Sequence, residues 1–131
     1  MCKRENQTAI NSEFVNMICL AETYFNTSDL KNYEYHQCVV LRTNDGKETV
    51  YSFACNSVED LIDQSCSVLS QDRKISVQKI VCMWDGGALD VPCHKFMEKL
   101  CDISAENKRA EILLSSHPGA YSVKRICDIV G

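Results

Sequence analysis

Long apolar runs are absent from the 131-residue sequence, which excludes a transmembrane helix because such a helix needs roughly 18 or more consecutive apolar residues. Residues 1–8 contain no apolar signal core, so we expect a cytoplasmic protein. The sequence also lacks any run of lysine and arginine, and its net charge is −4. Because a nucleic-acid backbone requires a basic surface, we expect neither nucleic acid nor a membrane as a partner.

Cysteine pairs of the C-x-x-C type are absent, although the sequence contains nine cysteines. The odd number and the missing pairs argue against the disulfide framework of a small secreted protein. We expect most of these thiols to be small apolar core residues in a reducing compartment. They are Cys2, Cys19, Cys38, Cys55, Cys66, Cys82, Cys93, Cys101 and Cys127.

Internal repeats, low-complexity tracts and linkers are absent as well. A chain of this length can bury one core of useful size, so we predict a single domain over residues 1–131. Hydrophobic periodicity and turn residues then predict its helices and strands. They are a helix over residues 8–25, strands over 33–42 and 48–54, a helix over 57–69, a strand over 75–84, a helix over 92–101 and strands over 110–115 and 120–123. Residues 124–130 either continue the last strand or form a helical turn.

Turn and cap residues locate several of these boundaries. Asp45-Gly46 is a strong hairpin turn because this pair tolerates positive φ. Pro92 suits the first position of the third helix, where its missing N–H costs nothing. The connection from strand 75–84 to strand 110–115 is long enough for a parallel crossover. The order α-ββ-α-β-α-ββ therefore predicts an α/β fold with a mixed five-stranded sheet covered by helices.

Three local runs within this order form a pattern. Residues 35–46 read Tyr-His-Gln-Cys-Val-Val-Leu and then Arg-Thr-Asn-Asp-Gly, residues 56–60 read Asn-Ser-Val-Glu-Asp, and residues 117–123 read His-Pro-Gly-Ala-Tyr-Ser-Val. In order and spacing they resemble the small single-domain cytidine deaminases, including blasticidin-type relatives, over nearly the whole chain. That family carries Phe-Pro-Val-Gly-Ala-Ala-Leu with Thr-x-x-Gly, then Asn-x-Glu-Asn, and finally Pro-x-Gly-x-Tyr-x-Val. The resemblance implies a three-layer α/β/α fold with helices on both faces of the sheet.

The departures from this family fall on its zinc-site motifs. Where the family's second helix carries Cys-Ala-Glu, Cys66 stands at the ligand position and Val68 replaces the glutamate that shuttles the proton. Where the third helix carries Pro-Cys-x-x-Cys, Cys93 matches the first cysteine and Phe96 replaces the second. A catalytic zinc needs three protein ligands, and these positions supply two. The resemblance thus implies no catalytic residue, no bound zinc and two vestigial ligand positions, Cys66 and Cys93, which are alternatively plain core thiols.

The resemblance also implies three substrate-binding residues. Tyr35 corresponds to a base-stacking phenylalanine, Glu59 to a residue that binds a ribose hydroxyl, and Asn56 could reach the nucleoside sugar. Each has a purely structural alternative. Tyr35 is alternatively a strand residue, Asn56 a helix cap and Glu59 a first-turn acid favoured by the helix dipole.

Other readings of the chemistry stay open. A Cys-His-Asp nucleophile set could be assembled from Cys93, His36 or His94, and Asp85. Trp84, at the end of a strand, is either a core residue or an interface anchor.

The function implied by the resemblance is that of a catalytically inactive cytidine-deaminase-like protein. Such a protein would act as a structural or regulatory subunit or as a module that binds a pyrimidine nucleoside. Because relatives of this size form tetramers, we expect a homo-oligomer, either a tetramer or a dimer, or a hetero-oligomer with an active paralogue. The alternative is an active zinc-dependent cytidine deaminase with rearranged metal ligands, in which case zinc is its cofactor.

Overall fold

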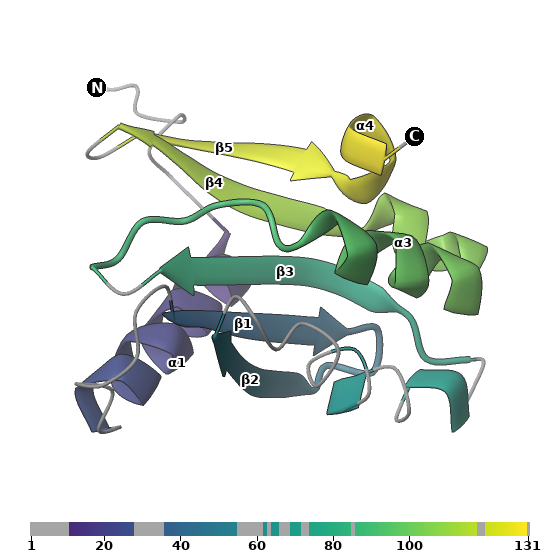
Figure 1. The fold of residues 1–131 in the computed structure, drawn as a ribbon, viewed down its shortest axis with the longest axis horizontal. Coiled ribbons are helices and arrows are strands. Elements are labelled where there is room, and N and C mark those ends of the chain that lie inside the picture. The colour runs from purple at the N-terminus through teal and green to yellow at the C-terminus, as the bar shows by residue number, and fades with distance from the viewer. Residues whose placement is uncertain are drawn as a thin grey trace.

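The computed structural model describes residues 11–27, 36–54, 62, 64, 65, 69–71, 74–84, 86–117 and 120–130. Its elements follow the predicted order (Figure 1). They are α1 (Ser12–Thr27), β1 (His36–Thr43), β2 (Glu48–Ala54), β3 (Val77–Trp84), α3 (His94–Ile103), the 3-10 helix η2 (Ala105–Arg109), β4 (Glu111–His117), β5 (Ala120–Arg125) and α4 (Ile126–Val130). Most of the helix predicted over 57–69 lies outside the described residues, although positions 62, 64, 65 and 69–71 are helical.

The five strands form one mixed sheet in the order β2-β1-β3-β4-β5. Strand β1 is antiparallel to both β2 and β3, whereas β3 and β4 are parallel and β5 returns antiparallel to β4. The parallel pair is joined through α3, as a crossover connection requires. The prediction of an α/β fold with a mixed five-stranded sheet is therefore confirmed.

The β1–β2 hairpin turns at the predicted dipeptide. Gly46 has a φ of 87°, and its N–H donates to the Thr43 carbonyl over 3.0 Å. The Thr43 hydroxyl donates to the Asp45 carboxylate, and this hydrogen bond is the main reason why the pKa of Asp45 is lowered. Only glycine adopts such a φ without steric cost, so the turn lies where the sequence predicts it.

Helix α1 begins at Ser12, and residues 8–10 of the predicted helix lie outside the described residues. Its start is set by Asn11, whose side-chain Oδ1 accepts a hydrogen bond from the Glu13 N–H over 2.6 Å. Asn11 thus acts as the N-cap of α1, because its side chain satisfies one of the free amides of the first turn.

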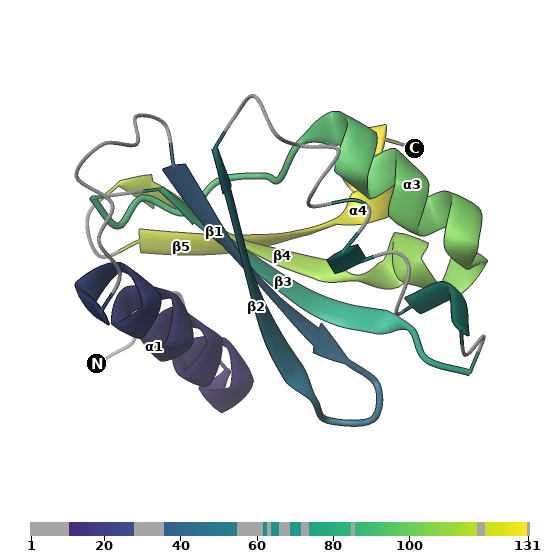
Figure 2. The same ribbon diagram turned by 60° about the horizontal axis from the view of Figure 1, so that its bottom comes forward.

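Alternation of side chains along the strands gives each face of the sheet its own core. One face carries the α3-side core, to which α3 contributes, and the other carries the α1-side core, to which α1 contributes (Figure 2). The α3-side core consists of Val39, Leu41, Ile62, Leu69, Val77, Ile80, Cys82, Phe96, Met97, Leu100, Ala110, Ile112 and Ile126. The α1-side core consists of Phe14, Met17, Ala21, Cys38, Val40, Val81, Met83, Leu89 and Leu113. Helices thus cover both faces of the sheet.

Helix α3 starts later than predicted, and this changes the role of Pro92. The helix begins at His94 with Cys93 as its N-cap, so Pro92 precedes the helix and does not occupy its first position. An extended backbone at Cys93, with φ −53° and ψ 135°, keeps that residue outside the helical turn. Phe96 on this helix is fully buried, whereas Cys93 and Cys101 are half-buried.

The cysteines of the central strands are core residues, as expected, whereas two cysteines on helices are exposed. Cys38 on β1 and Cys82 on β3 are fully buried, whereas Cys19 on α1 and Cys127 on α4 are exposed. The two helical residues are exposed because a helix of this fold contacts the sheet along one stripe only. The other three cysteines of the chain, at positions 2, 55 and 66, lie outside the described residues.

The C-terminal segment combines both structures proposed for it. Strand β5 continues to Arg125, and the chain then forms α4. In the part of the chain that the structure describes, each helix is too short or too polar to cross a bilayer.

Candidate functional site

Of the two vestigial ligand positions, the structure describes Cys93, which lies at the start of α3. The Cys93 carbonyl accepts the first hydrogen bond of the helix, from the Met97 N–H over 3.1 Å. Its thiol makes no capping hydrogen bond with any described residue and packs against the α3-side core. Cys93 therefore provides a half-buried thiol at the positive end of a helix, which is a suitable place for a thiolate ligand.

The residue three positions later places an aromatic ring where the family has its second cysteine. Phe96 is fully buried in the α3-side core. The same core contains Val39 and Cys82 on the strands that face the helix. A phenyl ring offers no ligand atom to a metal ion. The position that should hold the second thiolate is thus part of the packing between α3 and the sheet.

The segment between β3 and α3 turns back on itself directly after Trp84. The Trp84 N–H donates to the Ala88 carbonyl and the Gly87 N–H donates to the Trp84 carbonyl, both over 2.9 Å. Gly86 and Gly87 have φ values of 107° and 99°, which residues with a Cβ rarely adopt. The two glycines therefore make possible the tight reversal that brings Leu89 back beside β3.

Leu89 and Asp90 then lie between β3 and β4. On the β3 side, Leu89 forms an isolated antiparallel bridge with Met83, and the Asp90 N–H donates to the Cys82 carbonyl over 3.0 Å. On the β4 side, the Leu89 N–H donates to the Ser115 Oγ over 2.9 Å, and the Ser115 N–H donates to the Leu89 carbonyl over 3.3 Å. Figure 1 shows this segment running between the two strands, whose own pairing is confined to their beginnings. We call residues 89 and 90 the inserted segment.

The position of the inserted segment matters for ligand binding. In open α/β sheets, ligands usually bind in the crevice beyond the carboxyl ends of parallel strands. Here the carboxyl-terminal halves of β3 and β4 both bond to the inserted segment, and Leu89 is buried in the α1-side core. The chain itself therefore occupies the space between the two strands.

Trp84 has a defined role in this region. Its side chain is half-exposed, and its Nε1 donates to the Asp90 Oδ2 over 3.2 Å. The indole thus braces the reversal from β3 to the inserted segment. Of the two interpretations offered by the sequence, a fully buried core residue is wrong, and an interface anchor stays a prediction.

Most of the predicted site residues lie outside the part of the chain that the structure describes. Tyr35, Asn56, Glu59 and Cys66 lie outside the described residues, as does Asp85. His94 is described, and its imidazole is 60% exposed, with Nε2 lying 3.6 Å from the Glu98 carboxylate one turn later on the same helix. Within the described part of the chain, no three His, Cys, Asp or Glu side chains are grouped so that they could hold a metal ion.

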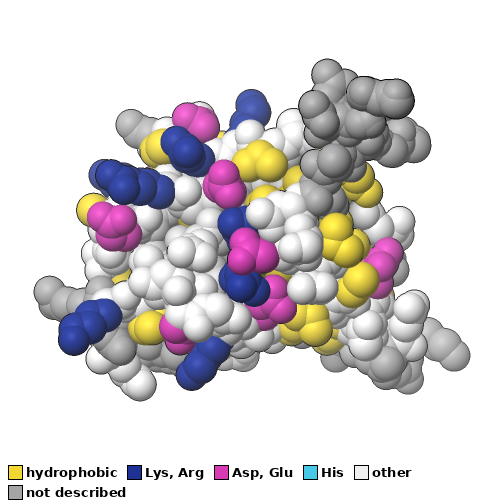
Figure 3. Space-filling view, turned by 180° about the vertical axis from the view of Figure 1, so that it is seen from behind, with side chains coloured by type: hydrophobic (Ala, Val, Ile, Leu, Met, Phe, Trp, Pro, Cys, Tyr) yellow, Lys and Arg dark blue, Asp and Glu magenta, His cyan; other side chains and the backbone are white. Residues whose placement is uncertain are grey.

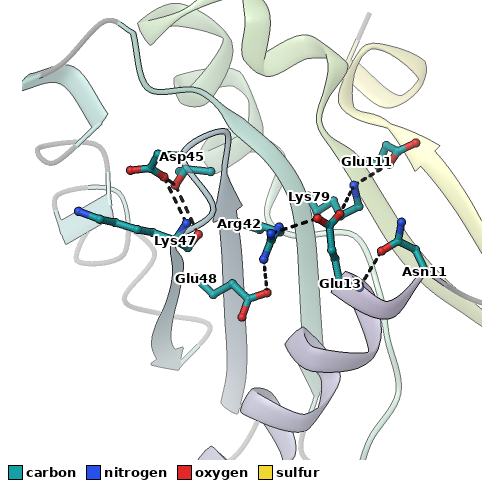
Figure 4. A network of polar contacts seen from close by, with 9 residues as sticks. Asn11, Glu13, Arg42, Asp45, Lys47, Glu48, Lys79 and Glu111 are labelled. Carbon is teal, nitrogen blue, oxygen red and sulfur yellow. Dashed lines mark hydrogen bonds and ion pairs between the residues drawn. The ribbon is translucent and has the colours of Figure 1, made fainter.

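A charged network on the other face of the sheet was missed by the sequence reasoning (Figure 4). Glu13 of α1 accepts from the Arg42 Nη2 of β1 over 3.0 Å and from the Lys79 Nζ of β3 over 3.1 Å. Arg42 also bonds to Glu48 over 2.8 Å, and Lys79 lies 3.5 Å from Glu111. The residues come from α1 and from four strands, so no local sequence motif indicates the network. We call these five residues the α1 anchor.

The electrostatics of the α1 anchor indicate a structural role. Lys79 and Arg42 are largely buried, with side chains 13% and 19% exposed, and Lys79 also lies 5.6 Å from the centre of the Phe14 ring. The hydrogen bond from Lys79 is the main cause that lowers the pKa of Glu13, and the charges of Lys79 and Arg42 contribute further. Figure 3 shows that acidic and basic side chains alternate across this face and form no patch of one sign. The cations are thus already paired with carboxylates.

Three surface cavities that the structure describes lie away from Cys93, and the first borders the α1 anchor. One of about 540 Å³ lies among Lys79, Arg109, Glu111 and Arg125, and a second of about 310 Å³ lies under the β1–β2 hairpin. The third, of about 380 Å³, is lined by α3, η2 and α4. Cys93 lines none of the three. The sequence matches no protein-family model and no curated protein.

Proposed function

We propose that the protein is a cytidine-deaminase-like module without catalytic activity, which acts as a structural or regulatory subunit of an oligomer. The observation that carries this proposal is the burial of Phe96 in the α3-side core, three residues after the half-buried Cys93. A zinc deaminase needs a metal-bound water, and the start of α3 offers one thiol beside packed hydrocarbon.

The arrangement of the elements supports the family assignment within this proposal. The described elements follow the order expected from the resemblance, with a hairpin, a parallel crossover through α3 and a final antiparallel strand. Helices on both faces of the sheet are compatible with the family's three-layer arrangement. The cytoplasmic location is part of the proposal and rests on the sequence alone.

A metal assay beside an activity assay tests the loss of catalysis. We expect freshly purified protein to contain less than about 0.1 equivalent of zinc, since at most two matching ligands are present. We also expect cytidine to remain unchanged when it is incubated with the protein. The Cys93→Ser variant is the matched control. Zinc near one equivalent in the unaltered protein that is lost in this variant would support the alternative, an active deaminase with rearranged ligands.

Light scattering tests the subunit role. We expect a dimer or tetramer, or a stable complex with an active deaminase that is co-expressed and co-purified. A protein that stays monomeric and retains no such partner contradicts this part of the proposal.

Binding of a pyrimidine nucleoside remains the second form of the proposal, with contacts from Tyr35, Asn56 and Glu59. These residues lie outside the described part of the chain. A bound ligand raises the unfolding temperature by mass action, so a thermal-shift titration with cytidine decides between the two forms. Because the inserted segment occupies the space between β3 and β4, we expect no shift. A saturable rise, absent in a Glu59→Gln variant, would favour the nucleoside-binding module.

A further inference from the structure

Two cysteines from different helices line one surface groove. The cavity of about 380 Å³ is bordered by Glu98, Cys101 and Asp102 of α3, by Lys108 of η2, and by Cys127 and Val130 of α4. Cys127 is exposed and Cys101 is half-buried, and both are free thiols. The groove therefore contains two thiols that small molecules can reach from solvent.

Helical spacing places each thiol on the stripe of its helix that lines the groove. Glu98, Cys101 and Asp102 are three and four residues apart, so they form one stripe along α3. Cys127 and Val130 are three residues apart and form one stripe along α4. Because both stripes line the same groove, α3 and α4 present their cysteines to a common space. Figures 1 and 2 both show α4 beside α3.

The neighbouring contacts hold α4 in this position. The Ile126 N–H donates to the Ala110 carbonyl over 3.0 Å, and the Ile126 side chain is fully buried in the α3-side core. Val130 packs against that core, as does Cys101. The first residue of α4 is therefore fixed directly before Cys127, which limits how far its thiol can move from α3.

The two thiols also interact electrostatically. Burial is the main cause that raises the pKa of Cys101, and the charges of Asp102, Cys127 and Glu98 raise it further, while Lys108 lowers it. Both thiols also line the same groove, so Cys101 lies beside a second thiol that is more exposed. The less accessible Cys101 is therefore suited to react second, after the exposed Cys127.

We propose that Cys101 and Cys127 form a thiol modification site that reacts with a low-molecular-weight disulfide and closes into an intramolecular disulfide. In the first step the Cys127 thiolate attacks the small disulfide, a mixed disulfide forms at Cys127, and one small thiolate leaves. In the second step the Cys101 thiolate attacks the Cys127 sulfur, the Cys101–Cys127 bond forms, and the second small thiolate leaves. Two protein thiols are oxidised and one small disulfide is reduced to two thiols.

The product covalently joins α3 to α4 across the groove. The closed loop contains η2, β4 and β5, and a cross-link of this kind restricts the unfolded chain. The oxidised protein should therefore unfold at a higher temperature than the reduced protein. In a reducing compartment such a bond is transient and reports the state of the thiol pool.

Peptide mapping after incubation with glutathione disulfide tests the proposal. Trypsin places Cys101 in the peptide 100–108 and Cys127 in the peptide 126–131, and each of these peptides contains one cysteine. After free thiols are blocked, we expect these two peptides to be joined as the main protein disulfide. In the Cys101→Ser variant the mixed disulfide at Cys127 should persist, whereas in Cys127→Ser neither product should appear at this site.

The exposed Cys19 on α1 provides the matched control, because its substitution by serine should leave the linked peptide unchanged. Unfolding temperatures of the oxidised and reduced protein give a second readout, and the Cys101→Ser variant should show no rise. A stable mixed disulfide at Cys127 in the unaltered protein overturns the proposal, because it would mean that Cys101 cannot reach it. Links from Cys101 or Cys127 to other cysteines as the main product overturn it as well.

Discussion

Asn107 is a fully buried polar residue that uses both ends of its side-chain amide. Its Nδ2 donates to the Leu100 carbonyl over 2.7 Å, and its Oδ1 accepts from the Val77 N–H over 2.8 Å. The residue thus joins the end of α3 to the start of β3 from a position on η2. The Leu100 carbonyl also accepts from the Ser104 N–H over 3.2 Å, so the amide adds a second bond there and gives the Val77 N–H its partner.

The Asn107→Ala variant should therefore be clearly destabilised. The substitution leaves the Val77 N–H without its partner in a buried position, and an unsatisfied buried group costs about 1–3 kcal/mol. Chemical denaturation measures the change in the free energy of unfolding. Asn44→Ala is the matched control, because Asn44 makes the same pair of bonds, to the Lys74 carbonyl and from the Ser76 N–H, but is exposed.

Water can replace the bonds of Asn44, so we expect this control to lose less than about 1 kcal/mol. Equal losses for Asn44 and Asn107 would contradict the argument that burial sets the cost of Asn107→Ala.

Cys38 should be unreactive in the folded protein. It is fully buried on β1, and burial raises the pKa of its thiol to about 12, so almost no thiolate exists near neutral pH. Brief alkylation with iodoacetamide followed by peptide mapping should label the exposed Cys19 and leave the peptide 32–42, which contains Cys38, unlabelled. Equal labelling of Cys19 and Cys38 in native protein would contradict the burial of β1, whereas both should react in denaturant.

At the scale of elements, α1 combines an apolar and an ionic attachment to the sheet. Phe14, Met17 and Ala21 lie on one helical stripe and pack into the α1-side core. The first turn adds Glu13, which bridges cations from β1 and β3. Burial of each large apolar side chain contributes about 1.5–3 kcal/mol, so packing dominates and the α1 anchor fixes the position of the helix start.

The α1 anchor makes the stability of the protein depend on pH in the acid range. The pKa of Glu13 is lowered from its ordinary value of 4.5, so its stabilising effect is fully present above about pH 4.5 and is lost as the pH falls through the lower folded value. The Glu13→Gln variant should be less stable than the unaltered protein at neutral pH. The difference should shrink below pH 4.5, where Glu13 itself becomes protonated.

Denaturant unfolding curves recorded across the acid range measure this difference. Glu22→Gln is the control, because Glu22 is exposed on the same helix. A difference between Glu13→Gln and the unaltered protein that stays constant below pH 4.5 would show that the α1 anchor does not depend on the charge of Glu13.

At the scale of the whole molecule, the two cores share a single sheet. Val39 belongs to the α3-side core and its neighbours Cys38 and Val40 to the α1-side core, so the same strand is buried on both faces. Loss of packing on one face exposes the strands that support the other face. We therefore expect the protein to unfold as one cooperative unit, as the predicted single domain requires.

Substitutions on opposite faces test this cooperativity. Phe96→Ala in the α3-side core should cost about 3–5 kcal/mol, and Met17→Ala in the α1-side core about 2–5 kcal/mol. In each variant, the fluorescence of Trp84, the single tryptophan, and the far-ultraviolet circular dichroism should change at the same denaturant concentration. Two separate transitions in either variant would indicate that the faces unfold independently.

Much of the fold could be predicted because its signals are local. The turn at Asp45-Gly46 depends on the φ of one glycine, and the strand predicted over 33–42 depends on its own aromatic and β-branched residues. The start of α3 was predicted two residues early, because Pro92 fits either the first helical position or the residue before a cap. The backbone conformation of Cys93 decides between these two positions of Pro92, and it cannot be predicted from the sequence pattern.

The sequence shows that the candidate site lacks a ligand residue, but it does not show how the site is packed. The replacement of a thiol by Phe96 is visible in the sequence, but the burial of its ring depends on strands that lie far away in the chain. The inserted segment was not predicted, because Leu89 bonds to Ser115 across 26 residues. The α1 anchor was missed for the same reason, since it joins α1 to four different strands.

The sequence by itself determined the order of helices and strands, the hairpin turn and the two apolar faces of the sheet, because each depends on neighbours within one or two turns of the chain. Only the tertiary structure decided that Leu89 and Asp90 lie between β3 and β4, that Glu13 anchors α1, and that Cys101 and Cys127 share a groove. These features are contacts between residues distant in sequence. Such contacts stabilise the protein only after the sheet has formed, so they leave no local pattern in the sequence.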